Sequence, residues 1–150
     1  MLYKKIVLAY DGSESGRRAL LGIKELGQWK RPKLFLLAVI PSGSLDVGAM
    51  EMAYVGCESP VDNRTSLKEQ LREEINVLRC MGFDVVEGIL EGDFIREIIK
   101  YAITQEADLI VVGHKREKSL LKRWFSGAIA QSLIENSPCN VLVVTHDDAK

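Results

Sequence analysis

The sequence has few of the features that mark secreted, membrane or metal-dependent proteins. It contains three cysteines and two histidines in 150 residues. An odd number of widely spaced cysteines is neither a disulfide framework nor a typical zinc pattern. No apolar run approaches the roughly 20 residues of a membrane-spanning helix, and the N-terminus shows no signal-peptide pattern. We therefore expect a cytoplasmic protein with no metal site and no contact with a membrane.

The cysteines that are present differ in their sequence context. Cys80 lies near the end of a helical pattern and Cys139 lies just before an apolar run. Free cysteine behaves as a small hydrophobic side chain, so we expect both residues to be buried. Cys57 lies in a predicted loop, where a thiol is more accessible.

The chain also lacks a surplus of basic residues. The chain has 20 lysines and arginines and 21 aspartates and glutamates, which gives a formal net charge of -1. Proteins that bind nucleic acid through its phosphates need a basic face. A basic segment at 114–123 has only Trp124 and Phe125 as aromatic neighbours. We therefore do not expect nucleic-acid binding.

What is present is an alternation of short apolar runs with longer amphipathic segments. Near-continuous apolar strands are typical of a parallel sheet that is covered on both faces. The pattern predicts one domain, residues 1–150, with an α/β fold: a doubly wound parallel sheet of five strands with helices on both faces. The predicted strands are residues 5–10, 33–40, 85–90, 109–113 and 140–144, and the predicted helices are 14–28, 66–81, the segment after Asp93, and 126–135.

Polar residues and glycines predict where these elements begin and end. Ser66 and Glu69 have the spacing of a capping box, Gly82 fits a helix stop, and Asp93 fits an N-cap. Residues 41–62 contain recurrent glycine, proline and serine, and predict a long loop of the kind that is often functional, in which part could form a short helical piece. The polar tail at 146–150 is expected to fray.

Open parallel sheets bind ligands beyond the carboxyl ends of the strands, where the strand order reverses. Asp11 directly follows the first predicted strand. Its carboxylate could accept hydrogen bonds from a ligand, or it could cap the following helix.

The loop at 113–127 allows two interpretations as well. Gly113 ends a predicted strand, and Ser126 and Gly127 open a predicted helix, whose free N–H groups attract anions. Lys115 and Arg116 add positive charge. The same residues would also make an ordinary helix cap and a solvated basic face.

Four stretches in this order and spacing resemble the universal stress protein family. They are residues 6–15 (IVLAYDGSES), 37–40 (LAVI), 107–113 (ADLIVVG) and 126–144. The resemblance covers almost the whole chain. It implies a Rossmann-like fold, of the adenine nucleotide alpha hydrolase type, with strand order 3-2-1-4-5.

Many members of that family bind ATP through glycine, two residues, glycine, nine residues, and then glycine followed by Ser or Thr. Here these positions hold Gly113, Arg116, Ser126 and Gly127, so the spacing is kept while three identities change. Arg116 could obstruct a phosphate or bind it. The resemblance implies ATP or AMP, with Mg²⁺, as the ligand. The implied nucleotide-binding residues are Ala9, Tyr10, Asp11, Val39, Val112, Gly113, Lys115, Arg116, Ser126, Gly127 and Ala128. Among them, Asp11 would hold ribose or adenine and Val39 would pack on the base.

Two functions follow from the resemblance. The first is a non-catalytic stress-response regulator that acts as a homodimer on partner proteins and has a degenerate nucleotide site. A branch of the family with a Gly-His pair after the fourth strand, as at Gly113 and His114, is taken not to bind ATP. The second is an ATP- or AMP-binding member with nucleotide-dependent switching or slow hydrolysis.

A dedicated enzyme is not expected from this sequence. There is no convincing nucleophile–base pair and no Walker-type phosphate loop. The last apolar strand, Asn140 to Val144, is expected at an edge of the sheet. Such an edge favours pairing with a second copy of the chain, which predicts a homodimer.

Overall fold

The structure is a computed structural model that describes residues 3–10, 22, 32–40, 60–116 and 131–147. For residues 60–66, 114–116 and 145–147 it describes the main chain alone. No helix in these ranges is long and apolar enough to cross a membrane.

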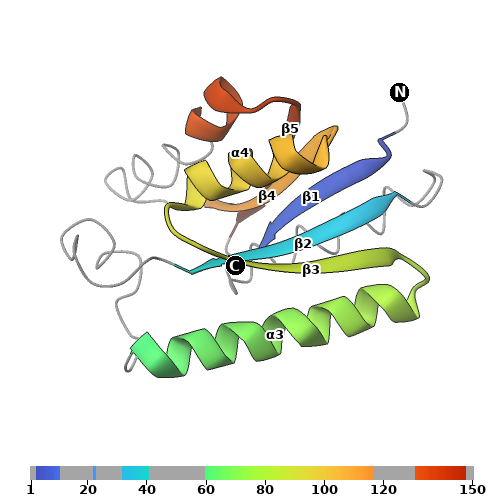
Figure 1. Ribbon diagram of the computed structural model, residues 1–150, viewed down its shortest axis with the longest axis vertical. Helices are drawn as coiled ribbons and strands as arrows, with labels where there is room; N and C mark the ends of the chain where they lie inside the picture. Colours follow the sequence, from blue (N-terminus) through green and yellow to red (C-terminus); the bar gives the residue numbers. More distant parts are fainter. Residues whose placement is uncertain (1–2, 11–21, 23–31, 41–59, 117–130, 148–150) are drawn as a thin grey trace.

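Five parallel strands form the sheet. They are β1 (Lys5–Tyr10), β2 (Lys33–Ile40), β3 (Asp84–Glu91), β4 (Leu109–Arg116) and β5 (Asn140–Asp147). Their order is β3-β2-β1-β4-β5, and every neighbouring pair is parallel (Figure 1). This confirms the predicted fold class and the strand order 3-2-1-4-5.

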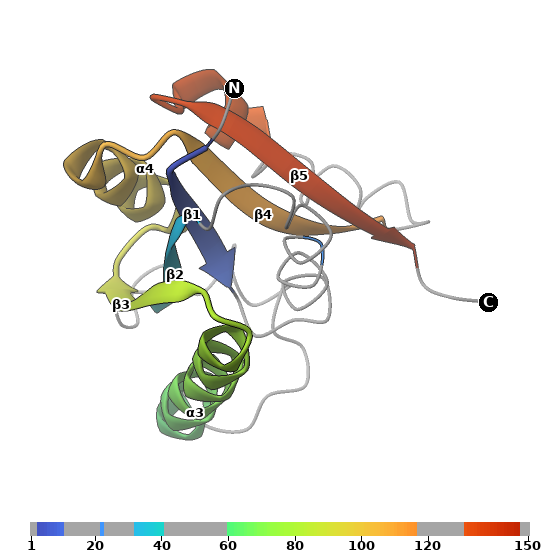
Figure 2. The same ribbon diagram turned by 90° about the vertical axis from the view of Figure 1, so that its right-hand side faces the viewer.

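Helices cover both faces of the sheet. Helix α3 (Pro60–Cys80) packs on β2 and β3 on one face, and α4 (Phe94–Gln105) packs on β1 and β2 on the other (Figures 1 and 2). A helical segment at 131–136 lies on the same face as α4. The sheet therefore separates two hydrophobic clusters.

The alternation of side chains along each strand fills these clusters. On the α3 face, Leu71, Ile75 and Leu78 of the helix meet one set of strand residues, including Ile6 and Leu36. On the α4 face, Ile98, Ala102 and Leu133 meet the alternate set, including Val7 and Leu37. Strands β1 and β2 are buried on both faces, which explains why their sequences are apolar without interruption after the first lysine of each.

The helix ends agree in part with the predictions. Asp93 caps α4 as predicted: its side chain accepts a hydrogen bond of 2.9 Å from the main-chain N–H of Arg96. Gly82 follows α3 with φ of 86°, a left-handed conformation that favours glycine. The C-cap of α4 is Glu106, a non-glycine residue with φ of 53°.

Three predictions were wrong. Helix α3 begins at Pro60, well before the predicted start, so Ser66 lies inside the helix and makes no capping box. Proline suits a first helical position because it has no N–H to leave unpaired. Residues 60–62, in the segment where a short helical piece was allowed, accordingly form the first turn of α3. Cys80 is exposed, because the buried stripe of α3 passes through Leu78 on another side of the helix.

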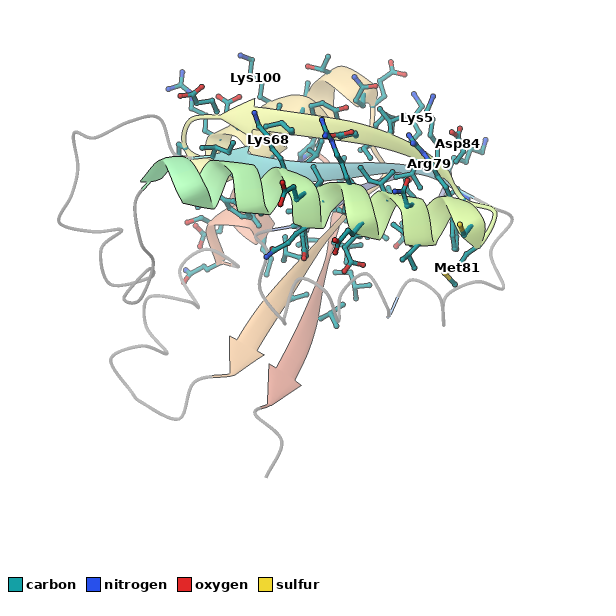
Figure 3. All side chains as sticks on the ribbon, turned by 90° about the horizontal axis from the view of Figure 1, so that it is seen from below. Lys5, Lys68, Arg79, Met81, Asp84 and Lys100 are labelled. Atoms are coloured by element: carbon teal, nitrogen blue, oxygen red, sulfur yellow. The ribbon has the colours of Figure 1, made fainter. Side chains whose placement is uncertain are left out.

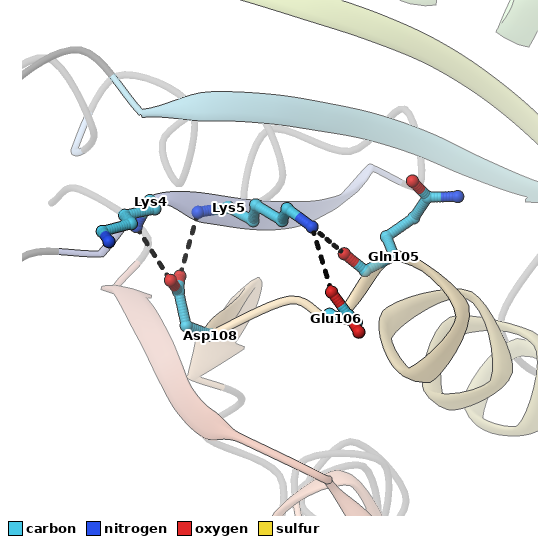
Figure 4. A network of polar contacts seen from close by, with 5 residues as sticks. All are labelled: Lys4, Lys5, Gln105, Glu106 and Asp108. Carbon is cyan, nitrogen blue, oxygen red and sulfur yellow. Dashed lines mark hydrogen bonds and ion pairs between the residues drawn. The ribbon is translucent and has the colours of Figure 1, made fainter.

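The amino ends of β1 and β4 are joined by a polar network (Figure 4). The Asp108 carboxylate accepts hydrogen bonds from the main-chain N–H groups of Lys4 (2.9 Å) and Lys5 (3.1 Å). The Lys5 ammonium donates to the Gln105 carbonyl (2.9 Å) and lies 3.6 Å from a carboxylate oxygen of Glu106. The start of β1 is therefore fixed against the loop that leads into β4.

Candidate functional site

The strand order reverses between β1 and β4. The chain runs outward from β1 to β2 and β3, and then crosses back to place β4 on the other side of β1. The carboxyl ends of β1 and β4 consequently border the position at which sheets of this kind bind ligands. We call this position the switch point.

Three predicted site residues lie together on one face of the sheet at this end. Ala9 of β1 pairs in register with Val112 of β4. Val39 of β2 belongs to the same hydrophobic cluster, on the α4 face. All three are small or medium apolar side chains and are buried, so these three residues offer van der Waals contact and no acid, base or nucleophile.

Tyr10 lies on the opposite face. It is the last residue of β1, and its side chain is buried in the cluster that faces α3. Its main chain still lies at the switch point, because β1 ends there.

Strand β4 continues beyond the residue at which the sequence pattern placed its end. The pattern placed Gly113 last and a basic loop after it, whereas β4 runs to Arg116. Gly113, Lys115 and Arg116 pair with Val144, His146 and Asp147 of β5. The predicted end of the last strand and the predicted fraying at 146–147 were wrong for the same reason.

The physical reason is that each strand supplies the other with hydrogen-bond partners after the core has ended. A run of apolar residues in the sequence predicts only the part of a strand that is buried. Figure 3 shows β4 and β5 extending together away from the other strands.

This extension leaves one side of β4 open among the strands that the structure describes. The pairing of β1 with β4 ends at Ala9 and Val112, whereas β4 has four further residues, 113–116. Main-chain groups along a strand point alternately to its two sides. Some N–H and C=O groups of 113–116 therefore face the switch point instead of β5.

Arg116 stands at the second glycine position of the family motif and lies in regular strand. An extended strand is open to any residue type. The backbone at Arg116 therefore does not require glycine. The remaining predicted site residues, Asp11, Ser126, Gly127 and Ala128, lie outside the described residues, as do residues 41–59 of the predicted loop and Cys57.

Two side chains elsewhere have perturbed ionisation, and both lie on the α4 face of the sheet. Burial raises the pKa of the Cys139 thiol, an effect that a hydrogen bond with Ser137 partly offsets. Burial also raises the pKa of Tyr101, whose ring meets Phe35 edge-on at 5.8 Å. In the described ranges no three His, Cys, Asp or Glu side chains gather as a metal site would need.

Sequence reasoning did not find the extension of the β4–β5 pair or the Asp108 network. The first has a weak signal, the β-branched Thr145 after the apolar run. The second has none, because an aspartate before a strand is common and its partners are more than 100 residues away.

The model of the universal stress protein family matches residues 2–145. This chain belongs to the universal stress protein family. Universal stress protein MJ0577 of Methanocaldococcus jannaschii is 30% identical over 96% of both chains. Its solved structure has a TM-score of 0.71 to this one at 25% identity, covering 99% of this chain and 100% of that chain.

Two more distant members of the universal stress protein family were solved with nucleotides. A family protein from Arabidopsis thaliana with AMP bound has a TM-score of 0.65 at 20% identity, covering 97% of this chain and 93% of that one. A universal stress protein in complex with cAMP has a TM-score of 0.57 at 19% identity, covering 96% and 98%. At these identities the likeness shows a shared fold.

Proposed function

We propose that this universal stress protein is a non-catalytic regulator whose switch point binds an adenine nucleotide. The observation that carries the proposal is the extension of β4 past β1. Residues 113–116 continue β4 directly from Val112, which belongs to the apolar cluster of Ala9 and Val39. An aromatic base needs an apolar face, and a phosphate needs N–H donors.

The two nucleotide-bound members of the family support this ligand class, since AMP and cAMP share adenine and ribose with ATP. Arg116 is compatible with it, because its main chain has a conformation that does not require glycine. The Ala and Val side chains at the described part of the site support the non-catalytic part of the proposal, because they can contact a base but can neither attack nor protonate a substrate.

The test is binding of AMP, cAMP, ATP and ATP with Mg²⁺ by isothermal titration calorimetry. We expect saturable binding of at least one nucleotide, and amide chemical-shift changes in the segment from Val112 to Arg116. Asp11→Ala should weaken binding because the sequence resemblance assigns Asp11 to the ribose or adenine. Asp84→Ala is the matched control, since Asp84 is an exposed acid at the amino end of β3 (Figure 3).

Absence of heat and of shift changes at millimolar nucleotide would reject the proposal and leave the degenerate-site interpretation. Release of phosphate from ATP faster than in protein-free solution, and lost in Asp11→Ala, would reject the non-catalytic part alone.

We propose further that the chain forms a homodimer through β5. The two edge strands differ. β3 exposes the acidic side chains of Asp84, Glu87 and Glu91, which oppose edge-to-edge pairing. β5 presents four apolar residues in succession, Val141 to Val144, all half-buried. Sedimentation equilibrium should give a dimer that Val143→Lys weakens and that Ile89→Lys, on the other edge, leaves intact.

A further inference from the structure

A groove runs along the outer side of α4. Its volume is about 610 Å³, and it lies between α4 and the helical segment at 131–136. Ile95, Ile99 and Ile103 form its apolar wall. They are spaced by four residues, so they make one ridge along the helix.

The apolar wall becomes more accessible along its length. Ile95 and Ile99 are half-buried, and Ile103 is 59% exposed. Covering an exposed apolar side chain such as Ile103 with another apolar surface is favourable, because it removes apolar area from water. Ile95 and Ile99 also pack against the core on the α4 face, so the exposed apolar surface of the ridge is centred on Ile103.

Two cations flank the isoleucine ridge on its solvent side. Arg96 and Lys100 lie one helical turn apart, both exposed, and both line the groove. Neither side chain makes an ion pair or a hydrogen bond with any other residue that the structure describes. The acid of the groove, Asp93, is engaged as the N-cap of α4. The Asp93 carboxylate keeps its charge, so the two cations against one anion leave this wall with a net positive charge.

The opposite wall is neutral and polar. Ser132 and Asn136 form it, and the Asn136 amide donates to the Ser132 carbonyl at 2.9 Å. Both walls are helical, so their main-chain groups are already paired within each helix. An extended peptide would find no strand edge here, whereas a helix can place its own ridge between the two.

From this arrangement we propose that the groove binds an amphipathic helix of a partner protein that has acidic residues along one side of its apolar stripe. Ile95 to Ile103 span about 12 Å of helix, which matches two to three turns of the partner. Its apolar stripe covers the isoleucines, and its carboxylates pair with Arg96 and Lys100. This site is separate from the nucleotide site and does not depend on it.

The probe is a stapled helical peptide of about 12 residues. It has leucine at every fourth position, and glutamate directly after the first two leucines. A twin peptide with lysine in place of glutamate tests the charge. We expect fluorescence anisotropy to show saturable binding of the acidic peptide, weakening with added salt, and no binding of the basic twin.

Matched variants locate the binding. Lys100→Glu should weaken the acidic peptide by about fivefold, the effect of one exposed charge pair, and Lys68→Glu on α3 should not (Figure 3). Ile103→Asp should weaken it by about tenfold. Its control is Ile134→Asp, because Ile134 is 60% exposed on the neighbouring helical segment but does not line the groove.

Circular dichroism of each variant is the control for folding. We expect every variant to stay folded, because the substituted positions are exposed. The proposal is overturned by equal affinity for both peptides, by equal effects of the groove and control substitutions, or by no binding at millimolar peptide. It is also overturned if Ile103→Asp dissociates a homodimer, since the groove then holds a second copy of this chain.

Discussion

Asp108 offers a test of how the sheet is held at its amino end. The substitution Asp108→Ala removes two hydrogen bonds, of 2.9 and 3.1 Å, from the N–H groups of Lys4 and Lys5. A hydrogen bond to a charged acceptor contributes about 1.5–3 kcal/mol when buried. Because one of these bonds is exposed and the other part-buried, water replaces much of each. We expect a loss of about 2 kcal/mol.

The assay is urea unfolding followed by circular dichroism, with the slope of the transition required to stay unchanged. For a domain of this size the same loss corresponds to a fall of about 4–8 °C in Tm. Glu106→Gln is the control. It removes the ion pair with Lys5, in which Glu106 is 86% exposed, and should cost less than about 0.5 kcal/mol.

Equal effects of the two substitutions would refute the reasoning. Equal effects would mean that hydrogen bonds to water fully replace those to the Asp108 carboxylate. The main-chain hydrogen bond from the Asp108 N–H to the Lys5 carbonyl would then be enough to hold this end of β1.

Three further predictions concern Gly88, Glu106 and Cys139. Gly88→Ala should destabilise the fold by about 1–3 kcal/mol, because the new Cβ would overlap Cδ2 of the fully buried Leu37; denaturant titration should show a much smaller cost in a Leu37→Ala background. Glu106→Gly should stabilise it by roughly 1 kcal/mol, since φ of 53° strains any residue with a Cβ; a loss of stability in the same titration would contradict this. Cys139 should react with iodoacetamide more slowly than exposed Cys80 at pH 8, because Cys139 is partly buried and burial raises the pKa of its thiol. Since the folded pKa exceeds the unfolded one, this thiol lowers stability as pH rises through the unfolded pKa; peptide mapping by mass spectrometry and urea titrations between pH 7 and 10 test both statements.

The sequence predicts the buried part of this fold well, for a physical reason. β1 and β2 are covered on both faces, so nearly every residue in them must be apolar. The predicted bounds of β1 and β2 are those of the structure, and β3 differs by one residue at each end. Asp93 and Gly82 were also found, because capping and left-handed backbone each select few residue types.

Prediction fails where hydrogen bonding between distant segments takes over from burial. His114, Lys115 and Arg116 look like loop by composition, but β5 supplies them with backbone partners. At the candidate site the family resemblance named Ala9, Val39 and Val112, and the structure places them in one cluster. The resemblance named Tyr10 with them, although neighbouring residues of a strand point to opposite faces, and the structure buries Tyr10 on the α3 face.

The start of β1 is tied to a distant part of the chain. Asp108 bonds the main chain of Lys4 and Lys5 to the loop before β4, more than 100 residues away. Local opening of a sheet is opposed by the hydrogen bonds made at the opening end. The N–H of Lys5 should therefore exchange slowly with solvent, and Asp108→Ala should speed that exchange. These bonds fix the register of β1 against β4 at their amino ends, so a ligand at the switch point meets two strands that are already aligned.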